Sequence, residues 1–101
     1  MVKLVALYKK SADAAAFDEH YEKVHTPLAK AMPGLRKLEV SRFYGAPAGE
    51  PKFYLMAEMY FDDEASMMAA LASEPGKAAG KDVMSFAGNL IHMMFARVEE
   101  A

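Results

Sequence analysis

The sequence predicts one α+β domain spanning residues 1–101, an antiparallel four-stranded sheet with helices on one face and the element order βαββαβ. Two observations predict it. Four segments are rich in apolar residues with the alternation typical of strands, and helical signals fill the stretches between the first and second strands and between the third and fourth. No linker separates these elements, and a chain of 101 residues has the length of a single domain.

The first strand is predicted over Val2–Tyr8, where both alternating faces are apolar, as in a strand that is buried on both sides. Ser11 or Asp13 is expected to cap the helix that follows, since both side chains accept hydrogen bonds from free backbone N–H groups. The apolar stripe of this helix is expected to comprise Phe17, Tyr21, Val24 and Leu28.

Pro27 is expected to break this helix beside His25, because proline lacks a backbone N–H and its ring clashes with the preceding turn. Thr26 is a good cap residue and Pro27 suits the first position of a helix. A second short helix is therefore expected to run to Met32, and Pro33–Gly34 is expected to end it.

The remaining elements follow from the same signals of alternation, turn residues and acidic caps. The expected segments are a strand over Leu35–Tyr44, a long hairpin loop over 45–51, a strand over Phe53–Phe61, a helix from the acidic caps Asp62 and Asp63 to Leu71, an interruption over 73–76, a helix over Lys77–Phe86 and a last strand over Leu90–Val98. The second helical region is thus expected to be split.

The strands are apolar on both faces, whereas the helices are sufficient to cover only one face of a four-stranded sheet. In the third strand, for example, Leu55 and Met59 alternate with Met56 and Tyr60. An uncovered apolar sheet face is most often covered by a symmetric partner. The sequence therefore predicts a homodimer that packs sheet against sheet, but the alternation leaves open which side chains face the helices.

The composition excludes several functional classes. The net charge of −2, with scattered basic residues, provides no basic stripe for nucleic acid. Without cysteine the chain has no disulfide or thiol chemistry, which suits a cytoplasmic location. The apolar runs are too short to span a bilayer, and the start of the chain lacks a secretory cleavage pattern. We expect no nucleic-acid or membrane partner.

The sequence also lacks the motifs of common cofactors. Its six glycines form no phosphate-binding fingerprint ahead of a helix, and there is no serine nucleophile elbow. His20 and His25 are five residues apart, which places them roughly 140° apart on an α-helix, whereas a helical metal pair needs a spacing of four. We therefore expect no metal and no cofactor, and we expect His20 to be a solvated or helix-edge residue.

The helix carries the pattern Phe17-x-x-x-Tyr21-x-x-x-His25-x-Pro27-Leu28, followed by Pro33-Gly34-Leu35 and by Asp82 ahead of Phe86. With the βαββαβ order, this pattern resembles the EthD family, named for ethyl tert-butyl ether degradation, within the ferredoxin-like dimeric α+β barrel superfamily. The resemblance implies a homodimer with an apolar cavity between sheet and helices in each subunit. Some members of the family look like cyclases, dehydratases or decarboxylases of polyketide-type aromatics, and wider relatives include cofactor-free monooxygenases and isomerases.

The same resemblance singles out His25 as the candidate catalytic residue. On a helical wheel His25 lies roughly 70° from the centre of the apolar stripe, at the edge of the buried face. An imidazole with an ordinary pKa of about 6.5 can act as a general base or acid. Free N–H groups in the turn that begins at Thr26 would favour the neutral base. The alternative is a histidine that only braces the helix junction.

Further pocket candidates carry hydroxyl, imidazole or carboxylate groups. Tyrosine hydroxyls orient a phenol or ketone in an apolar cavity, and nine methionines offer an adaptable lining. His92 interrupts an apolar strand as a pocket acid or base or as a hydrogen-bonded core residue. Glu58 needs a partner if buried, either Arg42 or His92. The candidates are Tyr8, Tyr21, Glu58, Tyr60 and His92.

Two functional hypotheses follow. The first is a cofactor-independent enzyme of the cyclase, dehydratase, isomerase or monooxygenase type, acting on a small hydrophobic or aromatic carbonyl compound in catabolism or secondary metabolism. His25 would move a proton while tyrosines hold the substrate oxygen. The second is a non-catalytic protein that binds such a ligand or supports a degradative oxygenase. Haem bound through a histidine is a third, weaker alternative.

Overall fold

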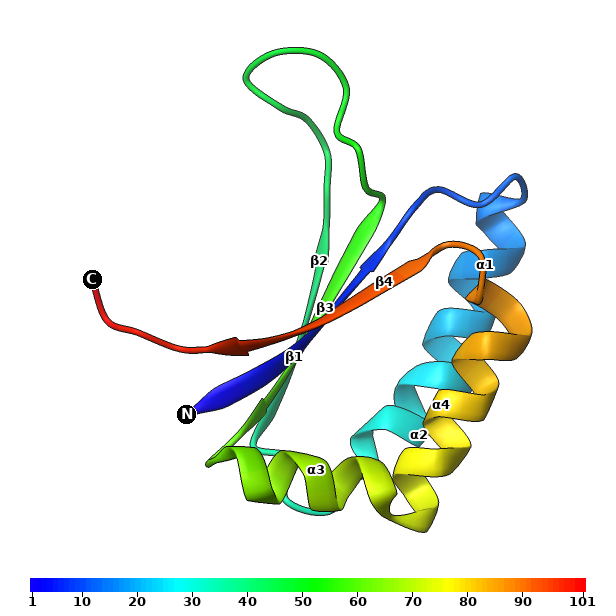
Figure 1. Cartoon of the computed structure of the whole chain (residues 1–101). Coiled ribbons are helices and arrows are strands. Elements are labelled where there is room, and N and C mark those ends of the chain that lie inside the picture. Colours follow the sequence, from blue (N-terminus) through cyan, green and yellow to red (C-terminus); the bar gives the residue numbers. More distant parts are fainter.

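Nine segments follow one another in the computed structural model, which describes all of residues 1–101 (Figure 1). The strands are β1 (Val2–Tyr8), β2 (Lys37–Arg42), β3 (Leu55–Phe61) and β4 (Ile91–Arg97). The helices are α1 (Ala14–His20), the π-helix η1 (Tyr21–His25), α2 (Thr26–Lys30), α3 (Glu64–Ala72) and α4 (Glu74–Ala87). The first strand has its predicted bounds. β2 and β4 are shorter than predicted at both ends, and β3 begins two residues later than predicted but ends at Phe61 as predicted.

The four strands form one antiparallel sheet in the order β2-β3-β1-β4. The two central strands are the first and third in sequence, and a twelve-residue loop, 43–54, joins β2 to β3. This is the ferredoxin-like α+β topology, so the predicted fold class and the long hairpin are both confirmed.

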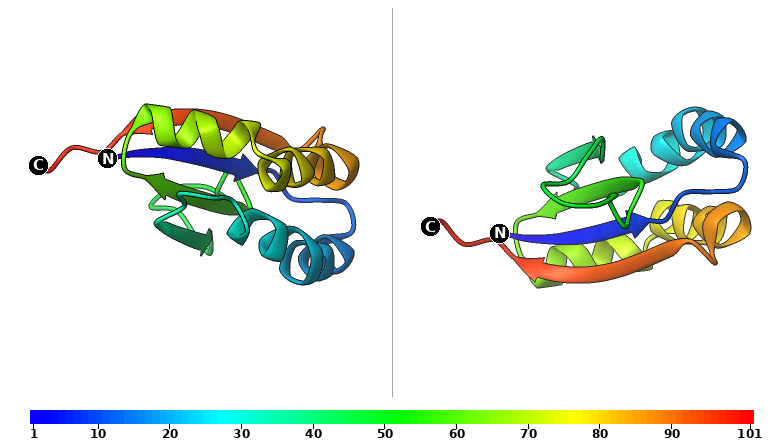
Figure 2. Two further views of the ribbon diagram at one scale, coloured as in Figure 1. Left: turned by 90° about the horizontal axis from the view of Figure 1, so that it is seen from below. Right: turned by 90° about the horizontal axis from the view of Figure 1, so that it is seen from above.

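All helices lie on one side of the sheet, and the helix formed by α1, η1 and α2 runs beside α4 (Figure 2). The side chains that face the helices include Leu4, Ala6 and Tyr8 of β1, whose partners across β3 are Met59, Ala57 and Leu55. These six side chains are buried and form the centre of the core. The structure thereby settles which side chains of the strands face the helices, which the sequence left open.

The predicted helix break beside His25 does not occur. The backbone stays helical through His20 and Thr26, and the turn over Tyr21–His25 is a π-turn, in which the N–H of Thr26 donates to the carbonyl of Tyr21. The hydroxyl of Thr26 donates to the same carbonyl at 2.8 Å, so Thr26 does not act as a cap. A π-turn is wider than an α-turn, and Pro27 enters it at the start of α2 without ending the helix.

The caps of α1 and α3 agree with the sequence, whereas the cap of α4 was not predicted. Asp13, not Ser11, caps α1 by accepting from Ala16 N–H, and Asp63 caps α3. The interruption predicted over 73–76 is Ser73 alone, which caps α4 by accepting from the N–H of Gly76. Pro75 lies in the first turn of α4, where its missing N–H leaves no helical bond unmade.

None of these helices has the length and apolar character that crossing a bilayer requires.

Candidate active site

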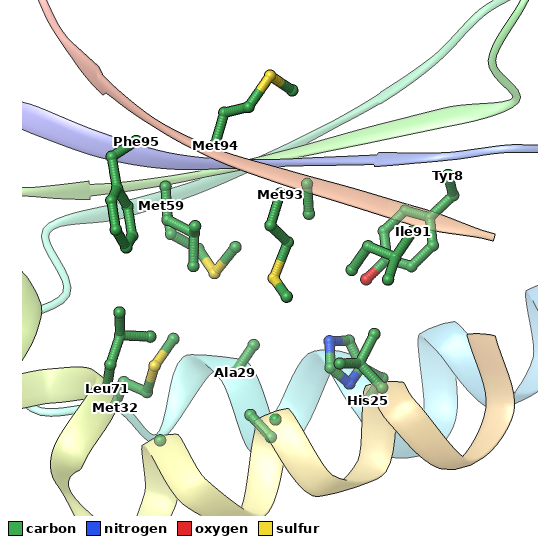
Figure 3. Close-up of a pocket in the computed structure, with 16 residues that line it drawn as sticks. Tyr8, His25, Ala29, Met32, Met59, Leu71, Ile91, Met93, Met94 and Phe95 are labelled. Carbon is green, nitrogen blue, oxygen red and sulfur yellow. The ribbon is translucent and has the colours of Figure 1, made fainter. Parts of the chain in front are cut away.

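A cavity of about 320 Å³ lies between the helix-covered face of the sheet and helices α2 and α4 (Figure 3). Thirteen of its sixteen lining residues are hydrophobic. The lining residues are Leu4, Ala6, Tyr8, His25, Ala29, Met32, Met59, Leu71, Gly76, Ala79, Gly80, Val83, Ile91, Met93, Met94 and Phe95. Such a volume is at the lower end of the range for small-molecule sites.

The cavity opens at the edge of the sheet. Met93 and Phe95 on edge strand β4 point into the cavity, whereas Met94 points away from it (Figure 3). Met93 is 51% exposed and Phe95 is 59% exposed. Because these inward-facing side chains remain this accessible, the cavity opens to solvent beside strand β4, and this opening is its mouth.

The π-turn places His25 in this cavity. In a continuous α-helix the apolar stripe that includes Tyr21 would continue through Val24. Because the π-turn is wider, His25 lies on the buried face instead of Val24. His25 is 7% exposed and Val24 is 43% exposed, so the prediction of Val24 as a stripe residue was wrong. Ala29 and Met32 continue the buried face after His25.

His25 is held by Asp82 of helix α4. Nδ1 of His25 lies 3.0 Å from Oδ2 of Asp82, and Nε2 of His20 lies 2.9 Å from Oδ1 of the same carboxylate. His20 is therefore not simply a solvated helix-edge residue. The expected angle of 140° between the two histidines assumed an α-helix, whereas the i→i+5 pattern of a π-turn brings residues five apart together.

Two polar atoms remain free inside the cavity. Nε2 of His25 and the hydroxyl of Tyr8 hydrogen-bond to no protein group. Every polar side-chain atom that is fully buried in this chain does have a partner, so these two unbonded atoms cannot be fully buried. Both atoms are therefore accessible from the cavity. Figure 3 shows the Tyr8 oxygen directed toward the layer that holds His25. A ligand in this cavity would meet one hydroxyl and one imidazole nitrogen among apolar walls.

Burial sets the protonation of both groups. It lowers the pKa of His25, although the hydrogen bond and charge of Asp82 oppose the shift and His20 reinforces it. Burial likewise raises the pKa of Tyr8 above its usual range, with smaller contributions from Tyr21 and Asp82. At neutral pH the cavity therefore presents a neutral imidazole and a protonated phenol. The free N–H groups expected at Thr26 are not the cause, because that N–H is bonded within the helix.

Tyr21 supports the site without lining the cavity. Its ring lies edge-on to Tyr8, with centroids 5.6 Å apart, and stacks on Phe17 at 5.9 Å. Burial raises the pKa of Tyr21 to about 12, and Arg42 opposes this shift. Tyr21 therefore stays protonated and fixes the position of Tyr8 by packing.

The other three candidates lie on the opposite face of the sheet. Glu58 and His92 are paired across the sheet with Val5 and Leu7, not with the residues that line the cavity. Glu58 forms an ion pair with Lys3 rather than with Arg42 or His92. His92 is exposed and lies edge-on to Phe53, so it is neither a core nor a cavity residue.

Tyr60, the third of these, lies on the same face as Glu58 and donates its hydroxyl hydrogen bond to Glu39. These placements correct the pocket prediction. With both strand faces apolar, the sequence held no signal to separate the two faces.

The residues that sequence reasoning missed are Asp82 and His20. Asp82 appeared only within the family pattern, and the spacing of His20 from His25 was evaluated on the wrong helix type. A five-residue spacing just ahead of proline is the signal that could have indicated a π-turn. No group of three or more His, Cys, Asp or Glu side chains is arranged to hold a metal ion.

Comparison with known proteins places this geometry in a family. The model of the EthD domain matches residues 9–89. The crystal structure of an EthD family protein from Bacillus halodurans is 52% identical, with a TM-score of 0.95 and coverage of 98% of this chain and 99% of that one. An uncharacterized 11.0 kDa protein in the thcB-thcC intergenic region of Rhodococcus erythropolis is 33% identical over 99 residues, covering 98% of this chain and 96% of the relative.

Two more distant structures share the fold. A dimeric ferredoxin-like protein of unknown function from Thermobifida fusca is 15% identical with a TM-score of 0.73, over 96% of this chain and 90% of that one. SnoaB, a cofactor-independent oxygenase from Streptomyces nogalater, is 12% identical with a TM-score of 0.71, over 99% and 94%. The family model and the two closer relatives extend over the strands and helices that build the cavity, and the chain belongs to the EthD family.

Proposed function

We propose that the protein is a cofactor-independent enzyme that transfers a proton on a small hydrophobic or aromatic carbonyl compound. His25 is the general base, and Tyr8 holds the substrate oxygen. The observation that carries this proposal is the pair of free polar atoms, Nε2 of His25 and the hydroxyl of Tyr8, in an otherwise apolar cavity.

The two groups suit complementary tasks. The protonated Tyr8 hydroxyl donates a hydrogen bond to a carbonyl oxygen, and the neutral His25 accepts a proton from the adjacent carbon or hydroxyl. As the C–H bond breaks, its electron pair moves onto the carbonyl oxygen, where the Tyr8 hydrogen bond stabilises the developing charge. The imidazolium then returns the proton to another atom of the substrate.

This deprotonation is the step that isomerases, cyclases and dehydratases of carbonyl compounds share. An electron-rich enolate is also the species that reacts with dioxygen in the absence of a cofactor. The Streptomyces nogalater protein of the same fold is described as a cofactor-independent oxygenase, which supports this chemistry within the fold. The cavity walls favour an uncharged substrate, because no Lys or Arg lines them.

The proposed enzyme is a homodimer. The face of the sheet opposite the helices carries the apolar residues Val5, Leu7, Met56 and Met94, which no helix covers. The Thermobifida fusca protein of this fold is described as dimeric, which supports the same assembly here. Each subunit would then keep its own cavity on the outer, helical side.

The enzyme hypothesis is tested by incubating the purified protein with a metabolite mixture and following it by mass spectrometry. Loss of a carbonyl compound with appearance of a product is the expected result. His25→Ala should reduce turnover by about 10²- to 10⁴-fold, the usual contribution of a positioned base. His92→Ala is the matched control, since it removes an imidazole from the face of the sheet opposite the cavity. Because that face is the proposed dimer interface, the two variants are compared once light scattering shows equal dimer mass, and His92→Ala should then leave turnover unchanged.

The second candidate function is ligand binding without turnover, either as a carrier or as an accessory to a degradative oxygenase. The apolar lining and the wide mouth at Met93 and Phe95 favour it, because binding needs only the cavity. Retention of an unchanged ligand in the same experiment, with equal affinity in His25→Ala, would select this function and reject the enzyme hypothesis.

A further inference from the structure

We propose that Asp82 and His20 are positioning residues for His25, which hold its proton on Nδ1 and so keep the Nε2 lone pair directed into the cavity. This inference deepens the proposed function, because a base is productive only when its acceptor atom faces the substrate. It rests on the arrangement of three side chains from three helical segments, α1, η1 and α4.

The hydrogen bonds determine the tautomers. An ionised carboxylate can only accept, so each histidine nitrogen that meets Asp82 must carry a hydrogen. Nδ1 of His25 donates to Oδ2 at 3.0 Å, and Nε2 of His20 donates to Oδ1 at 2.9 Å. When the proton of a neutral His25 occupies Nδ1, the other ring nitrogen is an acceptor. That nitrogen is the one accessible from the cavity.

His20 completes the arrangement by engaging the second carboxylate oxygen. With both oxygens bonded, Asp82 cannot rotate away from His25 without losing a hydrogen bond. The side chains of Asp82 and His25 are 12% and 9% exposed, so little water competes for these bonds. The side chain of His20 is 33% exposed and connects the cluster to the surface.

Aromatic packing fixes the two ring planes. The ring of Phe86, four residues after Asp82 on α4, lies 4.3 Å from that of His20 and 5.4 Å from that of His25, between centroids. Tyr21 contacts the ring of His25 at 5.5 Å. The imidazole of His25 is therefore held both by a hydrogen bond at one edge and by rings packed around it.

Several titratable groups around His25 affect its pKa. The titratable side chains that face it are Asp82 from α4, His20 and Tyr21 from its own helix, and Tyr8 from β1. Strand β4 presents only apolar residues to the cavity. Since His20 lowers the pKa of His25 and Asp82 raises it, their removal should shift the titration of His25 in opposite directions.

The proposal is tested without substrate by long-range ¹H–¹⁵N NMR of the histidine rings in ¹⁵N-labelled protein. In the wild type at a pH where His25 is neutral, Nδ1 should carry the hydrogen and Nε2 should appear as the unprotonated nitrogen. In Asp82→Ala the hydrogen should move largely to Nε2 and the pKa of His25 should fall. In His20→Gln, whose amide still donates to Asp82, the tautomer should persist and the pKa of His25 should rise.

The matched control is Asp18→Ala, because Asp18 is also hydrogen-bonded to side chains, those of Arg42 and Tyr54, but to neither histidine. It should change neither tautomer nor titration of His25. A wild-type His25 with its hydrogen on Nε2 would overturn the proposal, and this measurement needs no variant to fold. An unchanged tautomer in folded Asp82→Ala would overturn it as well.

The result is separable from the fate of the enzyme hypothesis. If the tautomer depends on Asp82 but no metabolite is converted, the positioning roles stand and the proposed reaction falls. If turnover is found but the tautomer is independent of Asp82, the reaction stands and the positioning roles fall.

Discussion

Tyr8 and His25 are buried residues, yet each keeps one unbonded polar atom that is accessible from the cavity, which is uncommon in a protein interior. A polar atom without a protein partner adds nothing to folding stability, and such atoms are candidates for ligand contact. Both residues were candidates from sequence, whereas Asp82 became interpretable only when the fold brought it to His25.

Tyr8→Phe separates binding from stability. The hydroxyl has no protein partner, so its removal should leave the melting temperature unchanged or slightly raised. A ligand that hydrogen-bonds to it should bind about fivefold more weakly, since one such bond contributes about 1 kcal/mol. Calorimetric titration with the ligand found by the metabolite experiment measures the affinity. A large fall in melting temperature would show that the hydroxyl is structural.

His25 should make folding stability sensitive to pH. Its pKa is lower in the folded protein than the ordinary value of about 6.5 in the unfolded chain. Between these two values the unfolded state binds more protons, so the free energy of unfolding falls as the pH drops below about 6.5. Above that pH the contribution of the neutral ring is fully present.

Thermal melts from pH 7.5 to 5.5 at constant protein concentration measure this effect. The wild type should lose more stability across that range than His25→Gln, which has no ring to titrate. Equal pH dependence in both proteins would show that other groups account for the loss.

At the scale of elements, the sequence predicted the number, order and type of the strands and the caps of α1 and α3, but not the caps of α2 and α4. The predicted features depend on local signals, such as alternation in Val2–Tyr8 and the acidic residue at Asp63. The π-turn was not predictable in the same way. The local sequence around Pro27 predicts a break in the helix, whereas the observed π-turn is stabilised by tertiary contacts of His25 and Tyr21.

Two glycines of α4 should respond oppositely to alanine. At Gly80 a Cβ would meet no atom within 4 Å, so Gly80→Ala should stabilise the protein by about 0.5–1 kcal/mol through helix propensity. At Gly76 a Cβ would overlap the backbone carbonyl groups of Ala70 and Leu71, where α3 meets α4.

Gly76→Ala should therefore destabilise the protein by about 1–3 kcal/mol, the usual effect of overpacking, despite the same gain in propensity. Denaturant unfolding of the two variants beside the wild type measures both changes. If Gly76→Ala were as stable as Gly80→Ala, the close approach of α3 and α4 would not constrain position 76.

At the scale of the whole molecule, the two faces of the sheet differ in what they contact. One face, with Leu4, Ala6 and Tyr8, packs into the core and lines the cavity, and the other face is not covered by helices. The sequence predicted apolar residues on both faces but could not say which was which, and for that reason Glu58 and His92 were mistaken for pocket residues. The register of β1 with its neighbours separates the faces.

The uncovered face supplies the last prediction. Leu7 lies on central strand β1 between Met56 and His92, opposite the helices. If a second copy covers this face, Leu7→Lys would bury a charge without a partner in the interface, which is strongly unfavourable. The wild type should scatter light as a dimer of twice the 11.1 kDa chain mass, and Leu7→Lys should shift to monomer or unfold at micromolar concentration.

Val24→Lys is the matched control for this change. Val24 is an apolar residue on the outer surface of the η1 helix, 43% exposed, so a lysine there adds the same charge away from the sheet. The control should remain dimeric. A wild type that stays monomeric, or a Leu7→Lys protein that keeps the dimer mass, would show that this face is not the subunit interface. Dissociation of both variants alike would contradict a dimer joined only through the sheet faces, because Val24 lies on the helical side of the molecule.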